Sequence, residues 1–389
     1  MLPNVSCFDN VNFISVQNPI LSKDCIPANC SDCFKMEHTR KVSDVLACSF
    51  SSWYPLFEKV TMKSVWLPLP DEVAAYVRSD GTVVSTEATH ADTQTDSEDE
   101  EDAVDWHAAE EDAPELQRPE FASFDTELRA ALAAVGGAAF VKLNWSAPVD
   151  VRWLSVGRAL RSQTPGDVHL LLRGSDRLQQ DLCQPFRDCA DGQGASVTPL
   201  LVLRRWQDVS PAAEFRCFVQ AGQLIAISQR EISQYFPHLV RDAAGIVTDI
   251  SSFFKEHIQA KFPLQNYVFD VYRPTKDRVR LLDFSPLAPP TDPALFTWPQ
   301  LRGEHCLRCE EPPPAGSPLC APCAAAGGVL PVFQHIADEE GIQRAPFADA
   351  EVPYDVRHLA EAGGAAAIIS LLRKSQLGKS DGSSDEEDG

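Results

Sequence analysis

YVFDVYRPTKDRVRLLDF, residues 267–284, decides the fold class, because it reads as a β-hairpin. Two apolar runs flank a polar segment that contains a proline, which is the pattern of two strands joined by a turn. A turn centred between Lys276 and Asp277 places Asp270 directly opposite Asp283. The two carboxylates therefore share one face of the predicted hairpin.

Two carboxylates at directly opposed positions need a compensating charge. Cross-strand partners have Cβ atoms about 5 Å apart, and like charges so placed are destabilising. A divalent cation would compensate them, and oxygen ligands without nearby His or Cys suit magnesium, which completes its shell with water and phosphate oxygens. The pattern therefore indicates a bound nucleotide, with Ser285 on the same strand face as a third, weaker oxygen ligand.

Ordinary roles for the two aspartates stay open at this point. One of them could face solvent, or they could form salt bridges with Arg216 or Arg280. A second hairpin supports the metal interpretation, because Glu214, Arg216 and Gln220 alternate with apolar residues and would form one polar strand face. Arg216 would then reach a phosphate group.

The remaining segments predict an α+β fold with largely antiparallel sheets and flanking helices. Strands are expected at 138–143, 168–173, 200–205, 215–220 and 224–228. Helices are expected at 71–77, 124–135 and 250–258. For the helix at 124–135, Ser123 is the expected N-cap and Gly136 the stop.

Cations on the predicted strands suit a phosphorylated ligand. Lys142 lies in the apolar run FVKLNW, and Arg173 ends the run LLLR. Two cations at strand ends would contact phosphate charge. The run LLVLRRW would offer backbone donors and acceptors to an adenine ring, with Arg204 or Arg205 beside it.

Acidic charge is concentrated in two segments. The formal net charge is -22, but residues 85–117 hold thirteen Asp and Glu without Lys or Arg, and residues 381–388 hold five more. Acidic segments with few core-forming residues predict disorder, and they argue against direct nucleic-acid binding. We expect them to maintain solubility or to meet basic partner surfaces.

The sequence carries neither an apolar run near the roughly 20 residues that cross a bilayer nor a signal-peptide pattern. We therefore expect a cytoplasmic monomer without membrane partners, whose twelve cysteines are thiols or metal ligands. Cys306-x-x-Cys309 and Cys320-x-x-Cys323 have the spacing of a zinc knuckle, and four thiolates satisfy a structural zinc ion. The alternative is a linker with free cysteines.

Several runs together resemble the cell-division-cycle protein 123 family. They are FVKLNWSAP (140–148), LVLRRW (201–206), EFRCFVQ (214–220), ISQRE (227–231), VFDVYR (268–273) and LLDFSP (281–286). With WYPLF (53–57), KSVWLPLP (63–70) and LFTW (295–298), the resemblance covers most of residues 45–301. It implies an ATP-grasp-like fold that binds ATP with magnesium. It also implies an assembly chaperone that binds the gamma subunit of translation initiation factor 2 and joins it to the alpha subunit.

The resemblance also implies roles for individual residues. Magnesium would be bound by Asp270, Asp283 and Ser285, and phosphate would be contacted by Lys142, Arg173 and Arg216. The nucleotide would be covered by the loop Asn144, Trp145, Ser146 and Ala147, and its adenine side would be lined by Leu203, Arg204 and Arg205. The chain departs from the family at Ser285, where Asn is usual and gives a longer ligand with a carbonyl, and at Arg173, where Lys is usual. The four-cysteine pattern is not part of the family's pattern.

These observations predict the following organisation. An N-terminal extension (1–40) is disordered, and an ATP-grasp-like domain (41–301) contains the disordered acidic insert (85–117). A Cys/Pro/Ala-rich linker (302–330) holds the zinc-knuckle pattern, a C-terminal segment (331–374) packs on the core, and an acidic tail (375–389) is disordered. Two other functions are weighed against the chaperone: an ATP-grasp enzyme that ligates a carboxylate to an amine or thiol, and a zinc-dependent interaction module.

Overall fold

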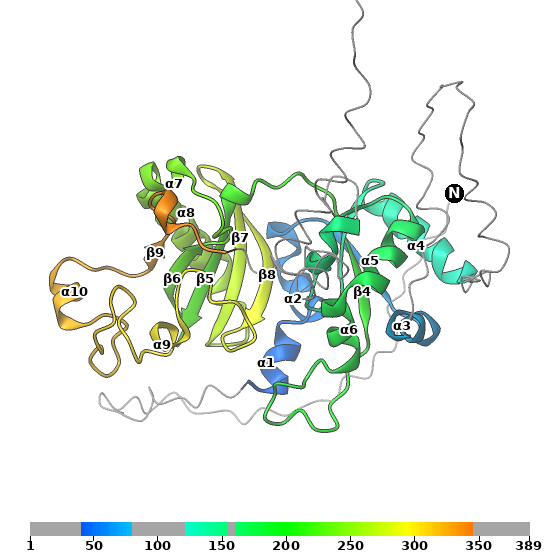
Figure 1. Ribbon diagram of the computed structural model, residues 1–389, viewed down its shortest axis with the longest axis horizontal. Coiled ribbons are helices and arrows are strands. Elements are labelled where there is room, and N and C mark those ends of the chain that lie inside the picture. Colours follow the sequence, from blue (N-terminus) through cyan, green and yellow to red (C-terminus); the bar gives the residue numbers. More distant parts are fainter. Residues whose placement is uncertain (1–39, 80–120, 155–159, 345–389) are drawn as a thin grey trace, which may run out of the picture.

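The computed structural model describes residues 40–79, 121–154 and 160–344, which form two β-sheets surrounded by helices (Figure 1). The strand orders are β1-β4-β2-β3 and β8-β7-β5-β6-β9, and all pairs except β6 with β9 are antiparallel. The predicted α+β class with largely antiparallel sheets is confirmed. The predicted disorder of the acidic insert and tail, and of the N-terminal extension up to residue 39, concerns residues outside this description. Among the helices of the described segments, none has the length and hydropathy that a bilayer crossing requires.

The strands are β1 (Ser64–Pro68), β2 (Ala139–Lys142), β3 (Arg161–Ser162), β4 (Leu200–Arg205), β5 (Glu214–Gln220), β6 (Gln223–Gln229), β7 (Tyr267–Thr275), β8 (Arg278–Pro286) and β9 (Val332–Gln334). The α-helices are α1 (Val42–Ala47), α2 (Phe50–Phe57), α3 (Asp71–Arg78), α4 (Ala122–Val135), α5 (Pro165–Gly174), α6 (Asp176–Cys183), α7 (Pro237–Arg241), α8 (Ala243–Phe253), α9 (Trp298–Leu301) and α10 (Ala321–Ala325). A π-helical turn (Phe254–Ile258) extends α8, and short 3-10 turns lie at Glu58–Val60, Val149–Leu154, Pro211–Ala213 and Glu339–Gly341.

The first sheet has one face covered by α3, α4, α5 and α6. Val141, Leu201 and Leu203 point to this side and pack with Leu128 of α4 and Leu172 of α5. Because side chains alternate along a strand, Lys142 of β2 and Arg204 of β4 lie on the opposite face, toward the second sheet. This alternation puts two cations between the sheets.

One face of the second sheet is apolar. The other face is apolar in one half and polar in the other. The apolar face packs on α2, α8 and the π-helical turn through residues such as Cys217, Phe269 and Phe284. On the other face, Phe218 and Val268 form an apolar half with residues of the 287–320 segment. The other half of this face carries the polar side chains of β5, β7 and β8.

The local predictions have mixed outcomes. The strand at Leu200–Arg205 is confirmed at both ends, and helix α4 ends at Gly136, whose φ of 107° is left-handed as expected of a C-cap glycine. Ser123 is not the N-cap, because α4 begins at Ala122 and Phe121 precedes it without a side-chain cap.

The strand predicted at 168–173 is wrong, because these residues belong to helix α5. Thr164 and Asp167 form a capping box, and Pro165 occupies the first turn, where its missing N–H is not needed. Val168, Leu171 and Leu172 have the helical spacing of a buried face. Local capping therefore overrides the strand-like apolar run, and Arg173 lies at the end of a helix.

The two sheets meet along β8, which lies at the edge of the second sheet. Arg204 of β4 donates from Nη2 to the Leu282 carbonyl at 2.7 Å, and the Thr61 hydroxyl donates to the Leu281 carbonyl at 2.8 Å. Helix α2 fills the space beside this junction, with the Trp53 ring 5.6 Å from that of Phe284. Figure 1 shows β8 facing α1, α2 and the first sheet. This junction positions the candidate site.

Candidate functional site

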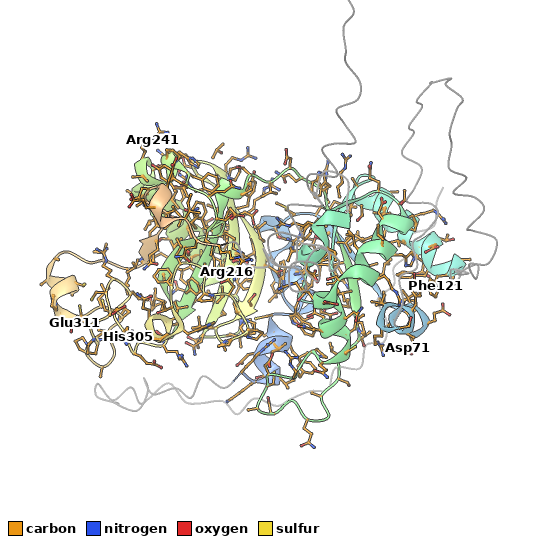
Figure 2. The ribbon with its side chains drawn as sticks, viewed as in Figure 1. Asp71, Phe121, Arg216, Arg241, His305 and Glu311 are labelled. Atoms are coloured by element: carbon orange, nitrogen blue, oxygen red, sulfur yellow. The ribbon has the colours of Figure 1, made fainter. Side chains whose placement is uncertain are left out.

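A row of polar residues crosses the second sheet at its junction with the first. Arg216 on β5 lies opposite Asp270 on β7, and Asp270 lies opposite Asp283 on β8. The predicted register of the hairpin is therefore confirmed at the two aspartates. In the view of Figure 2, Arg216 lies on the sheet in the interior of the molecule.

Asp270 is held by arginine. Arg216 donates from Nε and Nη2 to the two carboxylate oxygens, both at 2.8 Å, and Arg230 Nε lies 3.7 Å from Oδ2. Burial raises the pKa of Asp270, but Arg216 and Arg230 outweigh it and hold the pKa below its usual value. The salt bridge with Arg216 that the sequence left open is therefore present, whereas Arg280 is exposed.

Asp283 faces a lysine from the other sheet. Lys142 Nζ donates to Asp283 Oδ2, and the lysine side chain is only 2% exposed, whereas Asp283 keeps 24% of its surface accessible. Burial lowers the pKa of Lys142 below its usual value. This contact is the charged link between the sheets, and its carboxylate remains accessible to a ligand.

A β-bulge shapes the strand beside Asp283. Asp270 pairs with Asp283 but Val271 pairs with Leu281, so Leu282 is an extra residue without a partner on β7. The bulge turns the Leu282 carbonyl toward Arg204. Leu282 and Ser285 then line two different cavities on either side of Asp283.

The first cavity is basic and has a volume of about 230 Å³. Arg177, Arg216 and Arg230 line it, together with Ser285 and Asp292. Asp292 Oδ2 lies 3.4 Å from Arg230, and the Asp292 carbonyl accepts from Arg216 at 2.7 Å. Guanidinium groups gathered in a cavity suit phosphate or carboxylate oxygens.

The second cavity, of about 300 Å³, is more apolar. Its lining includes Phe140, Trp206 and Leu282, and its charged members are Arg152, Arg204, Arg205, Asp208 and Glu214. Burial raises the pKa of Glu214 to about 7. Within the described residues, the buried Arg204 Nε has no hydrogen-bond partner. A cavity with apolar walls and an unpaired Arg204 Nε suits a flat heteroaromatic group.

The profile of the D123 family matches residues 53–360, which is most of the chain. The chain belongs to the D123 family. Its sequence is 37% identical over 340 residues to the translation initiation factor eIF2 assembly protein of Xenopus tropicalis, covering 86% of this chain and 96% of that protein. The Danio rerio protein of the same name is 35% identical over 336 residues, covering 86% and 94%.

A solved D123 relative has a similar structure. Cdc123 from Schizosaccharomyces pombe superposes with a TM-score of 0.56 at 32% sequence identity, covering 70% of this chain and 96% of that chain. The resemblance to the cell-division-cycle protein 123 family is therefore confirmed by sequence and by structure.

The structure brings most of the predicted site residues to the junction of the sheets. Lys142, Arg216, Asp270 and Asp283 meet there, Ser285 lines the first cavity, and Arg204 and Arg205 line the second. Arg205 is exposed at the rim.

Two of the predicted residues have other contacts. The Leu203 side chain packs in the core on the far face of the first sheet, so only its backbone lies near the second cavity. Arg173 Nη1 donates to the Tyr76 carbonyl and to Ser79 Oγ, and its guanidinium lies 4.8 Å from the Tyr76 ring centroid. The prediction that Arg173 lies at a strand end is therefore wrong, because it lies in helix α5, which directs its side chain to α3.

The predicted covering loop is anchored by its own hydrogen bonds. Asn144 accepts from the Leu200 N–H at 2.7 Å, and Trp145 Nε1 donates to the Val45 carbonyl at 2.8 Å. Ser146 donates from N and Oγ to Asp181 at 2.8 and 3.0 Å. Trp145 and Ser146 line the first cavity, whereas Asn144 is buried and structural. Ala147 is half-buried at the end of this loop.

Sequence reasoning missed most of the charged residues that line the first cavity. Arg177, Arg230 and Asp292 line the first cavity, and so does Asp181, whose pKa is raised by burial. Arg230 lies in the ISQRE run, just beyond the strand predicted at 224–228. A charged residue at the end of a predicted strand could have identified it as a candidate site residue. Arg177 and Asp181 lie on helix α6, directly after helix α5. Because α5 was predicted as a strand, nothing in the sequence placed these two residues near the site.

The residues present fit a magnesium nucleotide. Two carboxylates and a hydroxyl, Asp270, Asp283 and Ser285, are hard oxygen ligands on one sheet face. Neighbours of the aspartates line both cavities, with Arg216 and Ser285 in the basic one and Glu214 and Leu282 in the more apolar one. A triphosphate and a base need this pair of environments.

Proposed function

We propose that this D123-family chain is an ATP- and magnesium-binding assembly chaperone of translation initiation factor 2. The observation that carries the proposal is the opposed pair Asp270 and Asp283. Their strand neighbours line a basic and a more apolar cavity, and Asp283 faces Lys142 of the other sheet. The names of the Xenopus tropicalis and Danio rerio relatives support the assembly role. Two facing antiparallel sheets with a ligand site between them are compatible with an ATP-grasp-like fold.

In this proposal, different residues bind the metal ion, the phosphates and the adenine. Asp270, Asp283 and Ser285 hold the magnesium ion, which neutralises phosphate charge when bound. Lys142, Arg216 and Arg230 contact the phosphates, and the adenine lies in the second cavity beside Phe140 and Leu282, as the chemistry of the two linings favours.

The bound nucleotide would set the arrangement of the two sheets. Lys142 and Asp283 form the charged contact between the sheets, and both would turn to the nucleotide and its metal. Magnesium and phosphate would replace this single contact by several contacts on each sheet. A fixed arrangement presents one surface to a partner, and we propose that this partner is the gamma subunit of the initiation factor in the cytoplasm.

An enzyme remains the second candidate, because five arginines line the first cavity. Such a cavity could hold a carboxylate next to the terminal phosphate of ATP, the arrangement in which ATP-grasp enzymes form an acyl phosphate for ligation to an amine or thiol. Release of ADP in proportion to an added carboxylic acid would identify this activity. The chaperone needs no such turnover.

The proposed function is tested by assembly of purified subunits. We expect the chain to retain the gamma subunit, and to promote its joining to the alpha subunit, only with ATP and magnesium present. Asp283→Asn should lose both effects while remaining folded. Asp277→Asn, which removes an exposed carboxylate from the turn of the same hairpin, should retain them. Equal retention of the gamma subunit by both variants would refute the proposal.

A further inference from the structure

The 302–330 segment brings four cysteine sulfurs to one point. Cys306 and Cys320 are buried, Cys309 and Cys323 are half-buried, and their four Sγ atoms all lie within 4.8 Å of one another. Cys309 Sγ lies 3.5 Å from Cys320 Sγ and 3.7 Å from Cys323 Sγ. No other group of three or more His, Cys, Asp or Glu side chains in the described residues has the spacing of a metal site.

These distances match a tetrahedron around zinc. A zinc–sulfur bond of about 2.3 Å gives a sulfur–sulfur edge of about 3.8 Å. A disulfide would instead bring sulfurs in pairs to about 2.05 Å. Two of the sulfur–sulfur distances, 3.5 and 3.7 Å, are close to this edge, and all four sulfurs lie within 4.8 Å of one another. Four sulfurs from two C-x-x-C pairs form a complete set of ligands without an open position, which is typical of structural zinc.

The backbone around the cysteines is prepared to hold thiolates. The Arg308 N–H donates to Cys306 Sγ at 3.4 Å, as in a knuckle that turns directly after its first cysteine. The backbone N–H groups of Cys320 and Arg308 both face the Cys306 sulfur. Two backbone bonds close the loop between the pairs: Cys306 N–H to the Glu311 carbonyl at 2.8 Å and Leu307 N–H to the Pro318 carbonyl at 3.0 Å.

We propose that Cys306, Cys309, Cys320 and Cys323 bind one structural zinc ion. Outside the zinc ligands themselves, this segment offers few large apolar side chains to a core, chiefly Leu307 and Leu319. A segment with so small a core needs a metal or another cross-link to stay ordered. Residues 302–330, read from the sequence as a linker, are folded in the structure.

The zinc knuckle would support the second sheet. Leu307, Leu319 and Cys320 pack with Phe218 and Val268 on the sheet face that carries Arg216 and Asp270 at its other half. Figure 2 marks the knuckle by His305 and Glu311, at the end of the molecule beyond β6 and β9. The ion would therefore anchor the chain that leads from β8 past Asp292 and back to β9.

The metal content of the full-length protein, purified with reductant, tests the proposal. We expect one zinc per chain, and cobalt in its place should give the strong sulfur-to-metal charge-transfer bands and visible bands of a tetrahedral thiolate site. Cys309→Ser with Cys323→Ser, both at half-buried positions, should lose the zinc. Cys183→Ser, at an exposed cysteine outside the cluster, should keep it.

The unfolding temperature gives a second measurement, independent of nucleotide. We expect a strong chelator to lower it by several degrees in wild type and in Cys183→Ser, and to leave the double variant unchanged. A protein without zinc that also fails to give the cobalt spectrum would refute the proposal, as would two disulfides in the reductant-treated protein. Because these readouts need no ATP or initiation factor, a failed zinc site is distinguishable from a failed chaperone proposal.

Discussion

At the scale of residues, the site is a row of two adjacent carboxylates with a cation at each end. Lys142, Asp283, Asp270 and Arg216 follow one another from the first sheet across the second, so each carboxylate already has a cation. A magnesium ion alone would have to displace these partners. Phosphate groups supply new acceptors for the displaced lysine and arginine, so metal and nucleotide should bind together. Strand alternation predicted the opposed aspartates, but it could not predict that each has a cation from another strand.

The two aspartates should differ in their effect on stability. Asp270→Ala leaves the Arg216 guanidinium, only 6% exposed, without its bidentate partner and should lower the free energy of unfolding by about 3 kcal/mol. Asp283→Ala should cost about 1 kcal/mol, because Asp283 is 24% exposed and the lowered pKa of Lys142 eases loss of its charge. Urea unfolding of both variants checks this order. An equal loss in both would mean that the Arg216 pair is not the stronger one.

Glu214 should make stability depend on pH. Its pKa is about 7 in the folded chain and about 4.3 when unfolded, so between these values the native state holds a proton that the unfolded chain has lost. Stability relative to Glu214→Gln should therefore fall as pH rises through this window, by up to about 1.4 kcal/mol per unit, and stay level above it. Urea unfolding of both proteins across the window measures the difference. A constant difference would contradict a half-buried Glu214 that is protonated in the folded chain.

At the scale of elements, the sequence predicted those strands and helices whose apolar residues follow one clear period. The β7–β8 hairpin follows from its alternation and turn, and β4 follows from a short apolar run of β-branched and aliphatic residues. Helix α5 was mispredicted, because its apolar run is short and its start depends on the capping box of Thr164 and Asp167. The bulge at Leu282 has no sequence signal, since it arises from packing at the junction of the sheets.

Helix α5 gives a test that separates fold from site. Arg173→Ala removes the hydrogen bonds to α3 and the contact with the Tyr76 ring, and should lower the free energy of unfolding by about 2 kcal/mol. Affinity for magnesium and ATP should stay within about twofold, because Arg173 lies outside both cavities. Unfolding and titration calorimetry of one preparation give both values. A large loss of affinity with unchanged stability would restore the phosphate role.

At the scale of the whole molecule, the site belongs to neither sheet alone. The first sheet contributes Lys142 and Arg204, and the second contributes the aspartates, the bulge and Arg216. Residues distant in sequence, such as Arg177 and Asp292, meet at one cavity only because the sheets face each other. Sequence patterns predict most of the long strands but not how the two sheets face each other, so the cavities and most of their charged lining could not be predicted.

The titration of ATP into the purified protein, with magnesium and with magnesium removed by a chelator, tests the central claim most directly. We expect saturable binding at one site with magnesium, at least about 10-fold weaker without it, and weaker by at least that factor in Asp283→Asn. Asp277→Asn should bind as wild type does. Equal affinity with and without magnesium, or unchanged binding by Asp283→Asn, would contradict a metal-nucleotide site at Asp270 and Asp283.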